Sequence, residues 1–384
     1  MVEGLHIKKM TTQGPDLQQN YFKTHFSQLP EPRRMTKGNI KYSLEEILFL
    51  TISAVISGCG TWISIEEFGE LKINWLQKFY PYKNGTPSHD AISDLFSILD
   101  SKLFGECFMN WTKSIADITD SEVVAFDGKT IKGVGSTDKK FPLHIVTAFC
   151  TKNKISLGQV SVEDKSNEIV AIPKLLDLLT LKGCIVTTDA MGCQKKIAEK
   201  IIEKKADYIL QVKDNQKELK EQIEKLFSLH TNRLLASEDD CGHGRIEKRI
   251  CEVINDLRFL DGKEAWKDLR SVVRITSERE MKATGVKSTE FRYYISSIPD
   301  NPHKINTSIR SHWGIENNLH WNLDVIFNED GQLKRKGNSA ENFNIINKVA
   351  LGLIENETTK KKSKPLKRLN ALLNDEYREK IMKV

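Results

Sequence analysis

The chain has 384 residues with 39% hydrophobic content, and its 58 Lys and Arg against 52 Asp and Glu give a formal net charge of +6. This length suggests two or three folding units with a sizeable buried core. No stretch approaches the roughly eighteen uncharged apolar residues of a membrane span, and the polar N-terminus is not that of a signal peptide, so neither membrane insertion nor secretion is expected.

Seven cysteines are scattered along the chain without paired CxxC spacing. This argues against a disulfide framework and a structural zinc site, and it favours a reducing compartment. The mild positive charge is only weak support for a polyanionic partner. Two basic segments near the C-terminus, Lys360–Arg368 and Lys334–Lys336, are either solvated surface or phosphate contacts.

The first part of the chain has a helical pattern. Residues 1–20 are polar and are expected to be disordered. From Tyr42 onward, apolar residues recur at spacings of three and four, which predicts a helix that is broken near Gly58. Ser88 is a candidate N-cap for a later helix. Residues 21–118 are therefore predicted to form a small all-helical domain.

The pattern then changes to apolar, β-branched runs, which predict strands. Three strands come first, at Val123–Phe126, Leu143–Cys150 and Ile155–Val162. Next come, in alternation, a helix at 168–181, a strand at Cys184–Thr188, a helix at Gln194–Lys204, a strand at Tyr208–Val212 and a helix at Gln216–Phe227. This order predicts a mixed α/β sheet with helices packed against it.

Residues 238–300 interrupt the alternation with strand-like segments separated by Gly and charged turns, which we interpret as a β-rich insertion. Helical periodicity resumes after Pro302 and continues, with a break, to Leu353. Residues 119–355 are thus predicted to be one core with an insertion, and 356–384 a basic C-terminal tail.

Three carboxylates occupy suggestive positions. Asp127 and Asp189 each follow a predicted strand, and Glu316 lies on the mostly apolar face of a predicted helix. Carboxylates that converge from separate elements can bind hard divalent cations through oxygen. Two such cations can clamp the attacking and leaving oxygens of a phosphoryl transfer.

Each carboxylate also has an ordinary explanation. Asp127 with Gly128 could form a turn, and Asp189 could cap the following helix. Glu316 could be satisfied by His312 or His320, because an unpaired buried carboxylate is costly. The basic residues Lys129, Lys213 and Arg245 could neutralise phosphate charge, or they could be solvated surface.

Several motifs resemble the DDE transposases of bacterial insertion sequences, specifically the ISAs-type group that includes the H-repeat-associated proteins. The similarity extends from about residue 25 to the C-terminus. Two N-terminal segments, Tyr42–Leu48 and Pro87–Asp90, resemble the domain that accompanies this family. The core motifs are Ala125–Thr130, Thr188–Ala190, Gln211–Gln216, His243–Arg249, Tyr293–Ser297, His312–Asn317 and Leu319–Val325.

The resemblance implies a ribonuclease H-like core in which Asp127, Asp189 and Glu316 hold two Mg²⁺ ions, with Mn²⁺ as a substitute. It implies that water nicks DNA at the end of an element and that the freed 3′-hydroxyl attacks target DNA. The implied partner is double-stranded DNA, both terminal inverted repeats and target, bound by a homo-oligomer. The implied location is the bacterial cytoplasm, at the nucleoid when bound.

The sequence departs from the wider group at one position. A lysine is expected seven residues after the glutamate, where this chain has Leu323. His320 or Arg310 are candidates for its phosphate-contacting role. Two other functions stay open: a catalytically silent or domesticated DNA-binding protein, and a metal-dependent nuclease on the same core. A doubly wound small-molecule enzyme is disfavoured, because no predicted strand leads into a glycine-rich nucleotide loop.

Overall fold

The computed structural model describes residues 21–34, 40–116, 119–134, 143–162, 168–242 and 244–384. The segment 1–20, expected to be disordered, lies outside the described residues. The described N-terminal part is helical, as predicted. Its helices are α1 (Tyr21–Phe26), α2 (Leu44–Ile56), α3 (Trp62–Leu71), α4 (Ile73–Leu76), α5 (His89–Ile98) and α6 (Ser101–Ile115).

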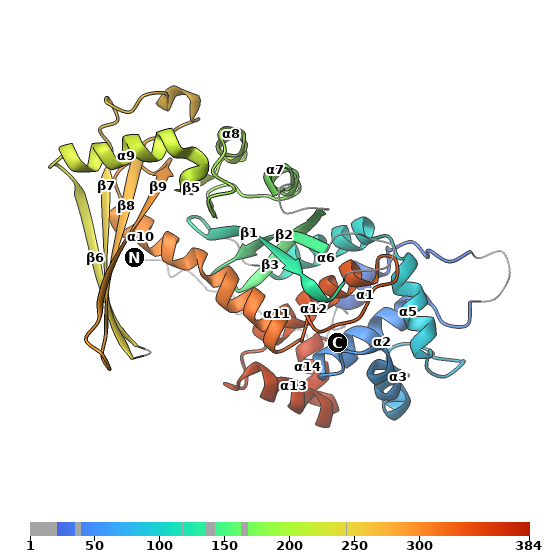
Figure 1. The fold of residues 1–384 in the computed structure, drawn as a ribbon. Coiled ribbons are helices and arrows are strands. Elements are labelled where there is room, and N and C mark those ends of the chain that lie inside the picture. The colour runs from blue at the N-terminus through green and yellow to red at the C-terminus, as the bar shows by residue number, and fades with distance from the viewer. Residues whose placement is uncertain (1–20, 35–39, 117–118, 135–142, 163–167, 243) are drawn as a thin grey trace, which may run out of the picture.

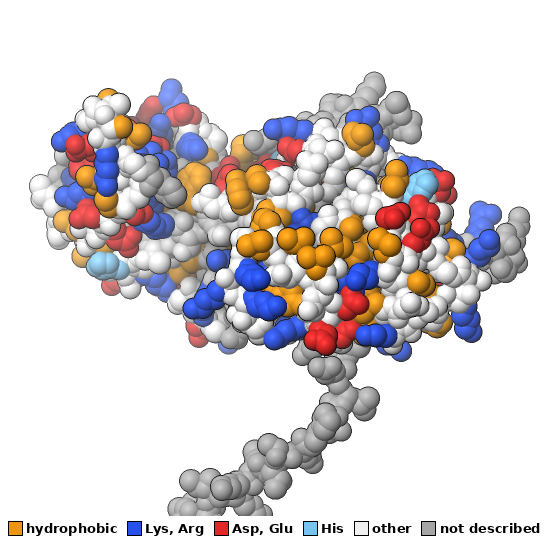
Figure 2. Space-filling view, turned by 90° about the horizontal axis from the view of Figure 1, so that it is seen from below, with side chains coloured by type: hydrophobic (Ala, Val, Ile, Leu, Met, Phe, Trp, Pro, Cys, Tyr) orange, Lys and Arg blue, Asp and Glu red, His pale blue; other side chains and the backbone are white. Residues whose placement is uncertain are grey.

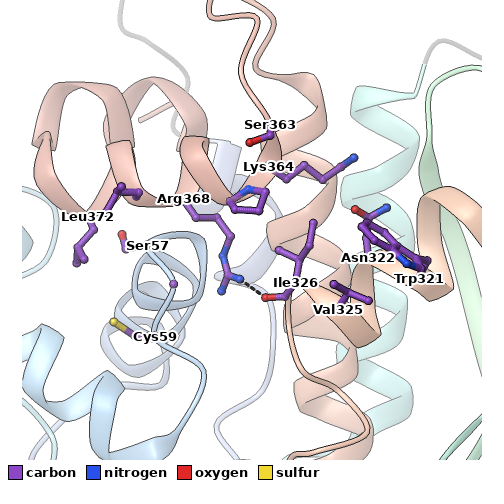
Figure 3. A pocket seen from close by; sticks show the side chains of 13 residues that line it. Ser57, Cys59, Trp321, Asn322, Val325, Ile326, Ser363, Lys364, Arg368 and Leu372 are labelled. Atoms are coloured by element: carbon purple, nitrogen blue, oxygen red, sulfur yellow. Dashed lines mark hydrogen bonds between the residues drawn. The ribbon is translucent and has the colours of Figure 1, made fainter.

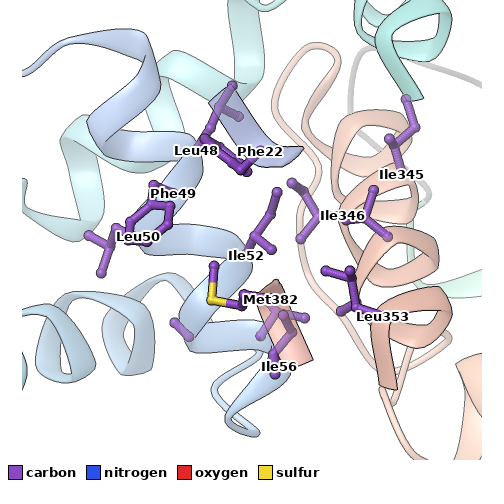
Figure 4. Close-up of a cluster of buried hydrophobic side chains, with 14 of the residues drawn as sticks. Phe22, Leu48, Phe49, Leu50, Ile52, Ile56, Ile345, Ile346, Leu353 and Met382 are labelled. Atoms are coloured by element: carbon purple, nitrogen blue, oxygen red, sulfur yellow. The ribbon is translucent and has the colours of Figure 1, made fainter. Parts of the chain in front are cut away.

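Local sequence explains where these helices begin. Ser43 and Glu46 form a capping box at α2, in which the Ser43 amide donates to Glu46 Oε2 at 2.8 Å and the Glu46 amide donates to Ser43 Oγ at 3.1 Å. Ser88 caps α5 by accepting from the Ala91 amide, which confirms the predicted cap. Helix α2 is buried along almost its whole length, and its Ile52 and Ile56 face α12 and α14 (Figure 4).

The predicted mixed α/β core is confirmed. Strand β1 (Val123–Ile131) pairs antiparallel with β2 (Leu143–Cys150) and parallel with β4 (Ile185–Thr188). Outside these lie β3 (Ile155–Val162) and β5 (Asp207–Val212), giving the order β3-β2-β1-β4-β5. One face is covered by α7 (Glu168–Leu178), α8 (Lys195–Glu203) and α9 (Lys217–Leu229), as Figure 1 shows.

The inserted strands extend this sheet. They are β6 (Leu234–Gly242), β7 (Arg245–Ile254), β8 (Ser271–Met281) and β9 (Lys287–Ser296), so the β structure starts slightly before the predicted residue 238. Because β9 pairs antiparallel with β5, all strands form one nine-stranded sheet that ends in β9-β8-β7-β6. The insertion projects at one end of the molecule, opposite the helical layer (Figure 1).

The chain after the insertion is helical and returns beneath the sheet. It comprises α10 (Pro302–His312), a π-helical segment (Ile315–His320), α11 (Trp321–Val325), α12 (Ser339–Asn356), α13 (Lys364–Leu373) and α14 (Asp375–Met382). Within the described residues, none of these or the earlier helices has the length and apolar composition to span a bilayer.

The structure differs from the predicted basic tail at 356–384. Ile381 and Met382 join the same buried cluster as α2, and the Arg378 side chain is fully buried against Trp75. Part of the basic run is also internal: Lys367 donates to the Ile354 carbonyl at 3.0 Å. The charge run was misleading at its end, where Lys367 and Arg368 are buried and bind carbonyl groups, whereas the lysines at 360–362 are exposed.

Candidate active site

A cavity of about 180 Å³ lies where β1, β4 and β5 meet α10 and the π-helical segment. Asp127, Asp189 and Glu316 all line it, together with Lys213. The fold thus brings to one place three carboxylates that are separated by 62 and 127 positions in the sequence (189 − 127 and 316 − 189). Most of the sheet-side lining comes from strand ends, where β4 and β5 stop.

Asp127 does not end its strand, contrary to the prediction, and it is not in a turn. Strand β1 continues to Ile131, and Asp127 pairs with Thr147 of β2. The pairing of β1 with β4 ends one residue earlier, at Phe126, which pairs with Thr188. Asp127 therefore lies just beyond the shorter neighbour. Burial, together with the negative charges of Asp189 and Glu316, raises the pKa of Asp127 to about 8.

Asp189 is held by the turn that follows β4. Its Oδ1 accepts hydrogen bonds from the amides of Met191 at 3.0 Å and Gly192 at 3.4 Å. Asp189 is therefore not the N-cap of the following helix, the alternative role considered for it, because Gln194 is the N-cap of α8. Burial and then the charge of Glu168 raise the pKa of Asp189, against the opposing effect of the two amides.

Glu316 is exposed at the cavity, which corrects the prediction of a buried carboxylate on an apolar face. The cause is the π-helical segment, in which the Trp321 amide donates to the Glu316 carbonyl. In this wider turn Ile315 and Leu319 fill the core and Glu316 points away from it. Single-turn π segments are often found at functional sites.

His320, four residues after Glu316, lies beside Asp127 and Glu316. Its Nδ1 lies 3.5 Å from Asp127 Oδ2, and its buried Nε2 has no hydrogen-bond partner among the described residues. Burial, followed by the charges of Lys129 and Lys348, lowers the pKa of His320 to about 3. Ligand atoms of Asp127, Glu316 and His320 all lie within 4.8 Å of one another, close enough to share a metal ion.

Comparison with known proteins decides the family. Residues 118–353 match the family model described as Transposase DDE domain, and residues 23–112 match the model of the segment associated with it. The chain belongs to the DDE transposase family. This membership supports a polynucleotidyl transferase or nuclease kind of activity, implies a DNA substrate, and fits the divalent-metal use that is general in the family.

Full-length relatives agree with this assignment. A protein of Escherichia coli O157:H7 named "Putative transposase YncI" is 41% identical over 93% of this chain and 93% of its own. The "H repeat-associated putative transposase YhhI" of E. coli K12 is 38% identical over 92% of this chain and 95% of its own. The predicted resemblance to the H-repeat-associated group is confirmed. A shorter relative, 41% identical over 19% of this chain, is named "Inactive transposase YbfQ".

The basic residues predicted around the site of this DDE transposase separate into distinct places. Lys213 is exposed and lines the carboxylate cavity. Lys129 is engaged elsewhere: its Nζ donates to Asp324 and, at 2.8 Å, to Glu329. Arg245 and Arg310 do not reach the cavity but line a neighbouring groove of about 550 Å³.

Sequence reasoning missed several residues of the transposase site. Trp313, 39% exposed, lines both the cavity and the neighbouring groove. His312 contacts Thr187 of β4, with Nδ1 2.9 Å from the hydroxyl oxygen. Trp313 could have been predicted, because it lies three residues before Glu316 and this spacing places both near one helical face. Gln211 and Tyr294 gave no such indication, because they come from strands whose pairing is not apparent in the sequence.

The transposase also has a larger hollow of about 750 Å³, shown in Figure 3, between α11, α13 and the end of α2. It contains none of the three carboxylates. Arg368 crosses it and donates to the carbonyl of Ile326, and Val325 and Leu372 contribute apolar lining.

The face seen from below carries a broad band of hydrophobic side chains (Figure 2). The candidate site is therefore chosen by its carboxylates and not by the size of the hollow.

Proposed function

We propose that this protein is the transposase of an insertion sequence, which cleaves DNA at the ends of its element and joins the freed 3′-end to target DNA. The observation that supports it is the convergence of Asp127, Asp189 and Glu316 on one cavity within a chain of the DDE transposase family. DNA carrying the terminal inverted repeats and target DNA are the proposed partners, assembled with more than one copy of the chain.

The carboxylates fit a pair of Mg²⁺ ions, with Mn²⁺ as a substitute. Burial, together with the nearby charges of Asp189 and Glu316, raises the pKa of Asp127 to about 8, and a cation bound there would stabilise these carboxylates. The charges of Asp189 and Glu316 both raise the pKa of Asp127, so we propose Asp127 as the ligand that the two ions share. When bound, the ions activate the attacking oxygen and stabilise the leaving 3′-oxygen of an in-line displacement.

The chain's own groups then have defined tasks. In cleavage, a water oxygen bonds to the scissile phosphorus as the bond from phosphorus to the 3′-oxygen breaks, and the 3′-oxygen leaves as a hydroxyl. In joining, this 3′-hydroxyl loses its proton and bonds to a target phosphorus, while the bond from that phosphorus to the 3′-oxygen of the target strand breaks and the target 3′-oxygen takes up a proton. Two backbone amides hold Asp189 Oδ1 in place. Lys213, at the cavity, neutralises phosphate charge. It is the proposed replacement for the lysine expected at Leu323, which is fully buried.

The other two candidates for that lysine role fit less well. His320 lies against Asp127 with its pKa lowered to about 3, so near neutral pH it is uncharged and suits a metal ligand or a positioning contact. Arg310 lines the neighbouring groove and pairs with Asp240. We therefore propose Arg310, with Arg245, for more distant phosphate contacts. Lys129, held by two carboxylates, is withdrawn from that role.

The test uses purified protein, Mg²⁺ and a supercoiled plasmid that carries the element's ends. Wild-type protein should give nicked and joined products. Asp127→Asn, Asp189→Asn and Glu316→Gln should each reduce both to background, whereas Glu264→Gln, an exposed carboxylate in the insertion, should not. Nicking without joining would identify a nuclease, and binding without either would identify a silent DNA-binding protein. Triad variants with full activity would refute the site.

A further inference from the structure

The groove beside the carboxylate cavity has an unusual charge composition. It lies where α10 packs against β7 of the insertion, and Trp313 forms a wall that it shares with the cavity. Its volume is about 550 Å³. The basic residues that line it are Arg245, Arg249, Arg279, Arg292 and Arg310.

Fewer carboxylates than guanidinium groups line the groove: only Asp240 and Glu247 accompany the five arginines there. Glu247 is shared by three of them, at 3.3 Å from Arg245, 3.6 Å from Arg249 and 3.3 Å from Arg279. Glu290 pairs with Arg292 at 2.8 Å and with Arg279 at 3.5 Å. Arg310 pairs with Asp240 and, at 3.8 Å, with Glu238. Alternate residues of β7 share one face of the sheet, so Arg245, Glu247 and Arg249 lie in a row there. Glu247 is thus the only carboxylate among the described residues that pairs with Arg245 or Arg249, which leaves a local excess of positive charge at these two.

Arg249 is the least satisfied of the five. The residue is only 7% exposed, and its Nε and Nη1 have no hydrogen-bond partner among the described residues. Its separation of 3.6 Å from Glu247 exceeds the roughly 2.7–2.9 Å of a charge-assisted hydrogen bond. Burial, and further the like charges of Arg310 and Arg292, lower its pKa. A buried cation in this state is costly without an anion.

We infer that the missing anion is the phosphodiester backbone of DNA, with Arg249 as the buried anchor and the groove as a track along which the strand approaches the carboxylate cavity past Trp313. That the polyanion is DNA rests on the proposed function. Guanidinium groups match phosphate in charge and in bidentate geometry, whereas a base edge alone would leave the charge uncompensated. Arg292 stacks on Trp313 with its guanidinium carbon 5.2 Å from the ring centroid, which fixes the shared wall.

Because the groove offers charge, its contribution to affinity should be independent of base sequence. The same residues also make a distinctive prediction for stability. If Arg249 were a structural link between β7 and its neighbours, its removal would destabilise the free protein. If it is a phosphate anchor, removal of a buried charge that is only weakly paired leaves the free protein equally stable or more stable and weakens DNA binding alone.

The test measures binding of the full chain to a fluorescein-labelled duplex of arbitrary sequence, by anisotropy over a range of NaCl concentrations without divalent metal. Arg249→Gln should raise the Kd about tenfold and reduce the slope of log Kd against log salt by about one. The matched control is Arg258→Gln, an exposed arginine of the insertion that pairs with Asp256 away from the groove. Its binding should equal that of the wild type.

Thermal unfolding without DNA supplies the second readout, in which Arg249→Gln should match or exceed the wild-type Tm. Arg245→Gln, an exposed groove residue whose replacement carries little risk for folding, should also weaken binding. Wild-type affinity in both groove variants, or a lower Tm for Arg249→Gln with unchanged affinity in Arg245→Gln, would overturn the inference.

The experiments distinguish a wrong assignment of the groove from a wrong proposed function. If the groove variants bind like the wild type while triad variants lose cleavage, the groove inference is wrong and the transposase proposal stands. If the groove variants lose binding while triad variants keep cleavage, the groove inference stands and the catalytic site is wrong.

Discussion

At the scale of single residues, one buried lysine connects the sheet with the helical layer. Lys348 of α12 is 4% exposed and donates to Thr147 Oγ1 at 2.9 Å and to Gln159 Oε1 at 2.7 Å. Thr147 is the register partner of Asp127, so this contact lies next to the carboxylate site. The pKa of Lys348 is lowered to about 7, mainly by burial.

This lowered pKa makes stability depend on pH. Between pH about 7 and about 10.5, the unfolded state carries a proton on this lysine that the folded state lacks, so the free energy of unfolding rises with pH there. Below pH 7 the charged side chain is buried at full cost. We therefore expect the effect of Lys348→Met on the free energy of unfolding to be more stabilising at pH 6 than at pH 10, by roughly 2–4 kcal/mol.

Urea unfolding of both proteins at the two pH values measures this difference. Lys361→Met, at an exposed lysine, is the control and should show the same small effect at both. An equal effect of Lys348→Met at pH 6 and pH 10 would mean that the folded protein does not disfavour the charged form.

At the scale of elements, the helices and strands of the core followed from periodicity, because each buries a face that repeats with its own spacing. Strand β1 was predicted too short, because Asp127 with Gly128 is a common turn pair, although in the structure they pair with Thr147 and Val146. The exposure of Glu316 could not be predicted, because a π-helical segment shifts side chains away from the α-helical spacing.

The last two helices show how a charge run can hide a packed element. We expect Ile381→Ser, at a residue 1% exposed, to destabilise the protein by roughly 3 kcal/mol, whereas Leu373→Ser, at a residue 74% exposed, should be nearly neutral. Chemical denaturation of the two variants tests this. Two neutral substitutions would mean that the segment from 356 onward is a solvated tail after all.

At the scale of the whole molecule, the carboxylate site lies at a junction. One sheet face rests on helices from both ends of the chain, through Ala125 and Phe149, while the other is covered by α7 to α9. Residues at the junction come from β1, the end of β4 and the π-helical segment. The family resemblance implied a ribonuclease H-like core with a β-rich insertion, but the pairing of β9 with β5 depends on long-range register, which no local pattern reveals.

This junction is expected to bind divalent metal through Asp127 and its neighbours. Electron paramagnetic resonance can count free Mn²⁺ in titrations of wild-type, Asp127→Asn and control Glu264→Gln protein at pH 6 and pH 8.5. Because the pKa of Asp127 is about 8 without metal, a proton competes with the ion below that pH. We predict that wild-type and control affinity rise strongly from pH 6 to pH 8.5, and that Asp127→Asn loses tight binding at both. Equal Mn²⁺ binding by all three proteins at both pH values would contradict the account.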